Sequence, residues 1–344
     1  MNYQNMGTFH APAIGANVKD AAIGANISMN DAAIASGNAF LISELEKRDT
    51  LIRTPLTSFT YPRDIPVDVG GGWVDSASAM SVGYGLTGGS ENGPVHAPGA
   101  NGIPVVQANL NKDAFKTHVF AVALRIMFVD MQRSQTIGRS LEQMLSDGVR
   151  MSYDKHMDAN VYVGLSDYGT YGLVNNPNVA SASVDAGSGG YTAWNTKTAD
   201  EILDDVNSAI TAVWAAAEYD RSAIPNHILL PYEQYVDLMT RKVSNDASKS
   251  IMQYLMENNV ASKEGSGLFI GATAWCKGAG TGSTDRMIVY CNDRRFLKVE
   301  ELVPLARVMT GPNPAEACYD STYMANLSEV EMFYTQTIKY FDGI

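Results

Sequence analysis

A stretch rich in glycine and proline, residues 55–111, limits what this chain can fold into more than any other feature. Ten of the thirty glycines lie between Gly70 and Gly102, and six prolines are spread over the same stretch. Both residue types are disfavoured inside helices, and a long segment without a helix usually has a function of its own. We therefore expect a long, twisted β-hairpin. Three runs favour strands: Ser58–Tyr61, Ile65–Val69 and Ile103–Leu110.

The segment after the hairpin predicts a strand followed by one long helix. β-branched and aromatic residues are dense over Lys112–Val129, which favours a strand. Apolar residues then recur three and four positions apart from Ser134 to Asn160, which predicts a helix. At 1.5 Å per residue this helix would be about 40 Å long, which is long for a compact domain.

The second half of the chain predicts a compact block of helices and strands. Thr198 and Glu201 form a capping box at the start of one helix, and Pro231 starts another that runs through Met239. The whole pattern therefore indicates an α+β fold. The remaining expected elements are a helix over Ser250–Asn258 and strands over Asn226–Leu230, Leu268–Cys276, Arg286–Cys291, Leu297–Leu302, Ala306–Met309 and Val330–Tyr340.

The first forty residues have no pattern long enough to build a core. Ala13–Asn17 is repeated at Ala22–Asn26, within small and mixed residues. We expect an extended arm that becomes ordered against a neighbouring chain, with a plain disordered tail as the open alternative. A short amphipathic helix is expected over Phe40–Ile52.

The charge balance excludes a broad basic face for nucleic acid. The net charge is −12, so the chain repels phosphate at long range. The three cysteines are far apart in sequence, which fits a reducing compartment without disulfides. No apolar run approaches the ~20 residues of a membrane span. Charged residues are few, at 18%, and we interpret this as a surface partly covered by partner subunits.

The motifs that suggest chemistry are weak, and we predict no catalytic residue, cofactor or metal. Gly83–Gly88 matches G-x-G-x-x-G, but a dinucleotide site needs a helix directly after it, and Gly89–Pro94 cannot start one. Asp154, His156 and Asp158 point to different sides of the expected helix, so they should not converge on a metal ion. A G-x-S-x-G nucleophile motif does not occur.

Three local sequences stand at distinct places in this order of parts: Tyr61–Val67, Gly172–Pro177 and the helix start Thr198–Leu203. Together with the order itself, they resemble the tailed-bacteriophage major capsid proteins with the Hong Kong 97 capsid fold, over about residues 40–344. The resemblance implies an N-terminal arm (1–54), an extended E-loop hairpin (55–111), a peripheral domain with a spine helix (112–195), an axial domain (196–295) and C-terminal strands that return to the peripheral domain (296–344).

The resemblance implies a structural protein that assembles with many copies of itself, as pentamers and hexamers, into an icosahedral head around double-stranded DNA. Such a chain would be made in the bacterial cytoplasm and end in the virion. It would act with a separate scaffolding protein, a portal and a cement or decoration protein. Some relatives form a lysine–asparagine crosslink from the E-loop, but no lysine lies between Lys47 and Lys112, so we expect no such crosslink. Candidate inter-subunit contacts at the hairpin base are Arg63, Asp64 and Trp73.

Two alternatives stay open from the sequence. The first is the shell of an encapsulin-like bacterial nanocompartment, which shares the fold and holds enzyme cargo. The second is a homo-oligomeric α+β enzyme, which would need a convergent polar site.

Overall fold

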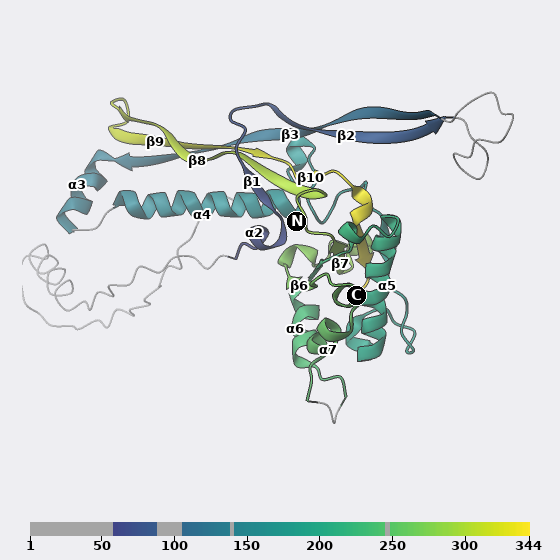
Figure 1. Cartoon of the computed structure of the whole chain (residues 1–344). Helices are drawn as coiled ribbons and strands as arrows, with labels where there is room; N and C mark the ends of the chain where they lie inside the picture. The colour runs from purple at the N-terminus through teal and green to yellow at the C-terminus, as the bar shows by residue number, and fades with distance from the viewer. Residues whose placement is uncertain (1–57, 88–104, 138–140, 245–247) are drawn as a thin grey trace, which may run out of the picture. The chain divides into compact units, whose positions relative to one another are not determined.

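A computed structural model of the chain describes residues 58–87, 105–137, 141–244 and 248–344 (Figure 1). All the described helices and strands belong to one unit, Phe59–Ile344. The predicted arm and its helix, Phe40–Ile52, lie outside the described residues, and so does the tip of the predicted hairpin.

The larger sheet has six strands and contains the predicted hairpin. Its strand order is β1–β8–β9–β3–β2, and β10 pairs with β8. β2 and β3 are antiparallel and form the hairpin, and β3 then continues beside β9. The hairpin is thus confirmed as a direct extension of this sheet. The strands are β1 Val67–Val69, β2 Ser76–Thr87, β3 Val105–Met127, β8 Leu297–Asn313, β9 Cys318–Ser328 and β10 Glu331–Met332.

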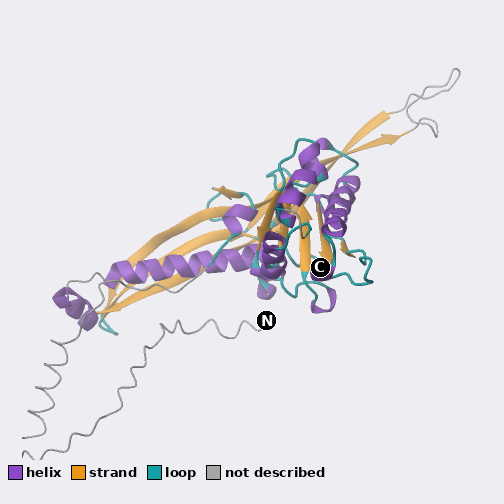
Figure 2. Cartoon of the chain, turned by 90° about the horizontal axis from the view of Figure 1, so that it is seen from below, coloured by secondary structure: helices purple, strands orange, loops and turns teal. Residues whose placement is uncertain are grey.

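One long helix, α4 (Leu141–Tyr162), runs along the larger sheet in both views (Figures 1 and 2). Residues four apart lie on one face of a helix, and this face packs in a core with Phe120 of β3. The buried apolar residues with this spacing are Val149, Tyr153, Met157 and Val161. The expected helix over 134–160 is therefore correct in type but begins later, since a separate helix, α3 (Phe128–Ile137), precedes it.

The smaller sheet has five strands in the order β4–β11–β7–β5–β6. Alternate residues of its strands point to two different cores: Ile228 packs with helices α5, α6 and α7, and Leu229 packs with α4. The sheet is therefore buried on both faces. Its strands are β4 Ser181–Ser183, β5 His227–Leu230, β6 Phe269–Ala272, β7 Arg286–Tyr290 and β11 Ile338–Asp342.

Three helices of this block begin where the sequence predicts, and a fourth, α8, was not expected. Thr198 and Ser250 are N-caps that form capping boxes with Glu201 and Gln253, and Pro231 precedes α6. The helices are α5 Ala199–Ala216, α6 Tyr232–Thr240, α7 Ile251–Asn258 and α8 Val260–Lys263. Short 3₁₀ turns are η1 Ser166–Tyr168, η2 Trp194–Thr196, η3 Arg221–Ala223, η4 Ala274–Cys276, η5 Thr281–Ser283 and η6 Thr335–Thr337.

Several expected elements were wrong. Ser58–Tyr61 is not a strand; a short helix, α2 (Tyr61–Asp64), forms there because Pro62 suits its first turn. The strand expected over Leu268–Cys276 ends at Ala272, where Thr273 caps a 3₁₀ turn. The two strands expected within 297–309 are one strand, β8, with register shifts. The strand expected over Val330–Tyr340 is interrupted, since η6 separates β10 from β11. β2, β4 and β9 were missed altogether.

One of the expected domain limits falls inside a strand. β3 runs without a break across the expected limit between residues 111 and 112, so hairpin and peripheral sheet share one strand. The five-part division stays a prediction.

Candidate assembly surface

The described part of the hairpin has one strongly apolar face. β2 and β3 pair in regular register from Ser76–Lys116 to Thr87–Val105, and side chains alternate between the two faces. The apolar side chains of one face are exposed to solvent, from 49% for Val82 to 78% for Tyr84. They are Met80, Val82 and Tyr84 from β2 and Val106 and Leu110 from β3. Contiguous exposed apolar surface of this kind marks a contact with another molecule.

The opposite face of the hairpin is small and polar. Ser81, Gly83 and Gly85 lie opposite Asn111, Asn109 and Gln107. The described part of the hairpin therefore has one apolar face and one polar face. The G-x-G-x-x-G match begins in this strand, so its described residues cannot cradle a phosphate at a helix N-terminus.

The segment that leads into the hairpin, residues 58–75, is called the hairpin base here. It is anchored by the buried carboxylate of Asp64, a residue that the sequence predicted as an inter-subunit contact. Asp64 is 0% exposed and accepts two hydrogen bonds from Arg63, at 2.5 Å from Nε and 2.8 Å from Nη2. The Tyr162 hydroxyl of α4 donates to the same carboxylate. The Tyr290 hydroxyl of β7 donates to the Asp64 carbonyl oxygen at 2.5 Å. Asp64 therefore joins α2, α4 and the smaller sheet within one chain.

This geometry changes the roles expected for the three candidate contact residues. The Asp64 side chain has no surface to offer a neighbouring subunit, so we withdraw it as a contact. Arg63 is held by Asp64 and donates to the Ala272 carbonyl oxygen, yet its side chain is 40% exposed. Trp73 is 54% exposed. Arg63 and Trp73 stay predictions.

A turn of three glycines presents Trp73. Gly70, Gly71 and Gly72 all have positive φ, which side chains disfavour. A Cβ on Gly71 would also lie 2.6 Å from Cδ2 of Leu302. Gly70 and Gly72 donate backbone hydrogen bonds to β8, so the turn is fixed to the larger sheet.

A second buried carboxylate, Asp158 of α4, supports the same base. Its Oδ1 accepts the backbone N–H of Thr60 at 2.8 Å, and its Oδ2 accepts the indole N–H of Trp275 at 2.7 Å. Burial raises the pKa of Asp158 against these hydrogen bonds. The sequence had considered this residue only as a metal ligand. Its partners are distant in sequence, so no local pattern reveals them.

His156 faces a histidine on the sheet. Its Nε2 lies 3.1 Å from Nε2 of His118 on β3, and its ring packs on Phe120. Burial and the neighbouring His156 lower the pKa of His118 to about 4, and burial lowers the pKa of His156. Both rings are therefore neutral at pH 7. Asp158 points to other partners, so the sequence expectation that Asp154, His156 and Asp158 do not converge agrees with the geometry.

The described residues contain no group of three His, Cys, Asp or Glu side chains arranged for a metal ion. Burial raises the pKa of the Cys291 thiol to about 11 and that of Cys276 further.

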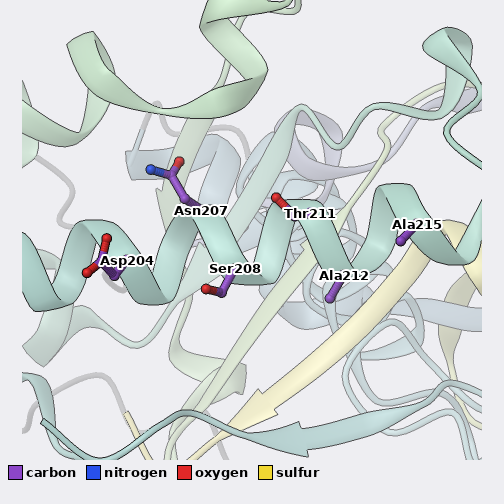
Figure 3. A pocket seen from close by; sticks show the side chains of 6 residues that line it. All are labelled: Asp204, Asn207, Ser208, Thr211, Ala212 and Ala215. Carbon is purple, nitrogen blue, oxygen red and sulfur yellow. The ribbon is translucent and has the colours of Figure 1, made fainter.

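No described helix is long and apolar enough to cross a membrane. A shallow hollow lies on the exposed side of α5 (Figure 3), lined by Asp204, Asn207, Ser208, Thr211, Ala212 and Ala215.

Solved structures similar to this chain include phage capsids. The capsid of Myoviridae phage XM1 superposes with a TM-score of 0.73 at 14% identity, over 88% of this chain and 98% of that one. The capsid of a native GTA particle gives 0.62 at 14% identity, over 91% and 99%. Microbacterium phage Oxtober96 gives 0.58 at 12% identity, over 89% and 98%. The fold is therefore of the Hong Kong 97 capsid type.

The family follows from the sequence itself. A family model described as "Major capsid protein" matches residues 95–344, which is most of the chain. The chain belongs to the major capsid protein family. A search of curated proteins gives no match.

Proposed function

We propose that the apolar face of the hairpin covers the surface of a neighbouring copy, so that many copies interlock into a closed shell around double-stranded DNA. The observation that carries this is the row of exposed apolar side chains on one face, with Tyr84 at its centre. Burying apolar surface contributes about 25 cal/mol per Å². Many such contacts add up in a closed assembly, and closed symmetry stops its growth.

The partners beyond the chain itself follow from the same proposal. Pentamers and hexamers of this chain would need a separate scaffolding protein to set their curvature, a portal for DNA, and a cement or decoration protein where noncovalent contacts do not suffice. The chain would be made in the host cytoplasm and function in the virion, without enzyme activity. With a net charge of −12, DNA would be held by confinement and not by specific contacts.

The experiment is electron microscopy of the expressed protein, with and without co-expressed scaffold. We expect shells or curved sheets from the wild type. The variant Met80→Ser/Tyr84→Ser should keep the protomer fold but lose most assembly. Tyr191→Ser is the control, because Tyr191 is exposed to a similar degree (67%) in a loop away from the hairpin. Equal assembly of the double variant and the wild type would refute the role of the apolar face. A small oligomer that turns over a substrate would refute the shell function.

A further inference from the structure

The outer edge of β2 is an open strand edge without the usual protection. β2 ends the strand order of the larger sheet, so its only described partner is β3. In an antiparallel pair about half of the residues point their backbone N–H and C=O groups away from the partner. Over Ser76–Thr87 this leaves about six residues with outward-facing groups. Exposed edges of this length pair with other chains unless something blocks them.

Natural proteins block such edges with prolines, charges or bulges, and β2 has none of these. Ser76–Thr87 contains no proline and no charged residue, and its register with β3 is unbroken. β3 also has an open edge within the hairpin, on the side away from β2. Near the base, this strand contains the charged residues Lys112 and Asp113.

β8 also has an open edge, and in contrast to β2 it contains blocking residues. Beyond Leu302, β8 has only β9 as a described partner, so one side of it is open. That segment contains Pro304, Arg307 and Pro312, and the register of β8 with β9 shifts three times between Glu301 and Met309. β8 therefore has prolines, a charge and register shifts along its open side, whereas β2 has none of these.

We propose that the outer edge of β2 pairs with a strand supplied by a second copy of this chain in the assembled shell. This inference rests on the proposed function, because it adds a main-chain contact to the contact of the apolar face. Every copy carries one such edge, so the number of edges matches the number of copies.

The charge distribution supports a second copy as the occupant. The chain has 37 acidic and 25 basic residues, so two copies repel each other over most of their surfaces. The outer part of the hairpin, Ser81–Thr87 paired with Val105–Asn111, contains no charged residue, so the repulsion between copies is weakest there. Nearer the base, β2 faces Lys112, Asp113 and Lys116 of β3. The absence of lysine and arginine from the outer part of the hairpin also argues against nucleic acid, since phosphate contacts depend on those residues.

The test is hydrogen–deuterium exchange of β2, resolved to single amides by fragmentation, on the protomer and on particles assembled from this chain alone. In the protomer, alternate amides of β2 should exchange fast, because they point away from β3. In the particle, we expect these amides to become as slow as those bonded to β3. Unchanged exchange of the outward amides in particles would overturn the edge pairing while leaving the proposed function intact. Protection that arises only after a second protein is added would overturn the choice of occupant. If the wild type forms no particle at all, both proposals fail.

A pair of matched variants gives a second readout. Gly85 and Gly311 both lie in strands, neither has a positive φ, and a Cβ at either would meet no heavy atom of the described residues within 4 Å. Gly85→Lys places a blocking charge on the open edge strand, and Gly311→Lys places it on the strand that is already protected. We expect Gly85→Lys to raise the protein concentration needed for assembly about tenfold, and Gly311→Lys to leave it nearly unchanged. Equal effects of the two variants would count against the edge.

Discussion

Replacing Asp64 by asparagine tests whether the base of the hairpin is anchored within each chain. Asp64→Asn keeps the size of the side chain but removes its charge and places an amide group among donors. The carboxylate accepts two charge-assisted hydrogen bonds from Arg63 and one from Tyr162, each of the kind that contributes about 1.5–3 kcal/mol. Removing one partner of a buried ion pair costs about 3–5 kcal/mol.

The expected cost lies at the lower end of that range. The Arg63 side chain is 40% exposed, so water recovers part of its lost solvation. The Tyr162 hydroxyl keeps Thr60 as a second partner, at 2.7 Å. We therefore expect a loss of about 3 kcal/mol of unfolding free energy, which lowers the urea midpoint of the protomer by about 1 M.

Asp68→Asn is the matched control. Its carboxylate pairs with Arg294 at 3.2 Å, and both side chains are accessible to solvent, at 32% and 67%. Exposed ion pairs contribute about 0–1 kcal/mol, so this variant should change the midpoint little. If Asp64→Asn also costs less than about 1 kcal/mol, the buried carboxylate does not hold the hairpin base, and the reasoning is wrong.

Three further outcomes are expected. The unfolded chain protonates His118 near its ordinary pKa of 6.5 and the folded chain only near 4, so acidification from pH 6.5 to 4 destabilises the fold, by about 2 kcal/mol at pH 5. Urea unfolding of His118→Gln at pH 7 and pH 5 should lack this part of the slope, and an unchanged slope contradicts it. Burial raises the pKa of Glu331 to about 7, so the folded protein loses stability as the pH rises from 4.5 to 7 and this buried carboxyl ionises. Glu331→Gln should therefore be more stable than the wild type at pH 8 but not at pH 4. Thermal unfolding of both proteins at the two pH values tests this. Trp73→Ala should change protomer stability by less than about 1 kcal/mol, because Trp73 is exposed, and should lower the assembly yield measured by sedimentation. Full yield removes Trp73 as a contact.

Local features of the sequence predicted local structure well. The capping boxes at Thr198 and Ser250 and the proline before α6 mark helix starts because they act on backbone groups within one turn. The four-residue spacing along α4 was readable because a helix repeats every 3.6 residues. The start of α4 was misplaced, since the apolar spacing continues into α3 and does not show that two helices are present.

Elements that depend on distant partners were predicted poorly. β9 contains polar residues such as Asp320, Ser321 and Asn326, which conceal its strand pattern. Each of the three has a tertiary partner: Asp320 pairs with Arg125, Ser321 bonds to Thr310, and Asn326 donates to the carbonyl oxygens of Gly72 and Val74. The strand therefore exists because β3 and β8 lie on either side of it.

By itself, the sequence determined the hairpin, the long helix and the α+β class. Glycine and proline disfavour long helices over residues 55–111, although the four-residue helix α2 forms there, and apolar spacing then indicates the type of many of the following elements. Only the tertiary structure decided the roles of the charged residues at the hairpin base. Asp64 looked like a surface contact beside Arg63, yet it is fully buried and bound by Tyr162, 98 residues further along the chain. A carboxylate is stable there only because the Tyr162 hydroxyl of α4 joins the two donors of the neighbouring Arg63 on it, and the approach of a hydroxyl from another element is a property of the folded chain.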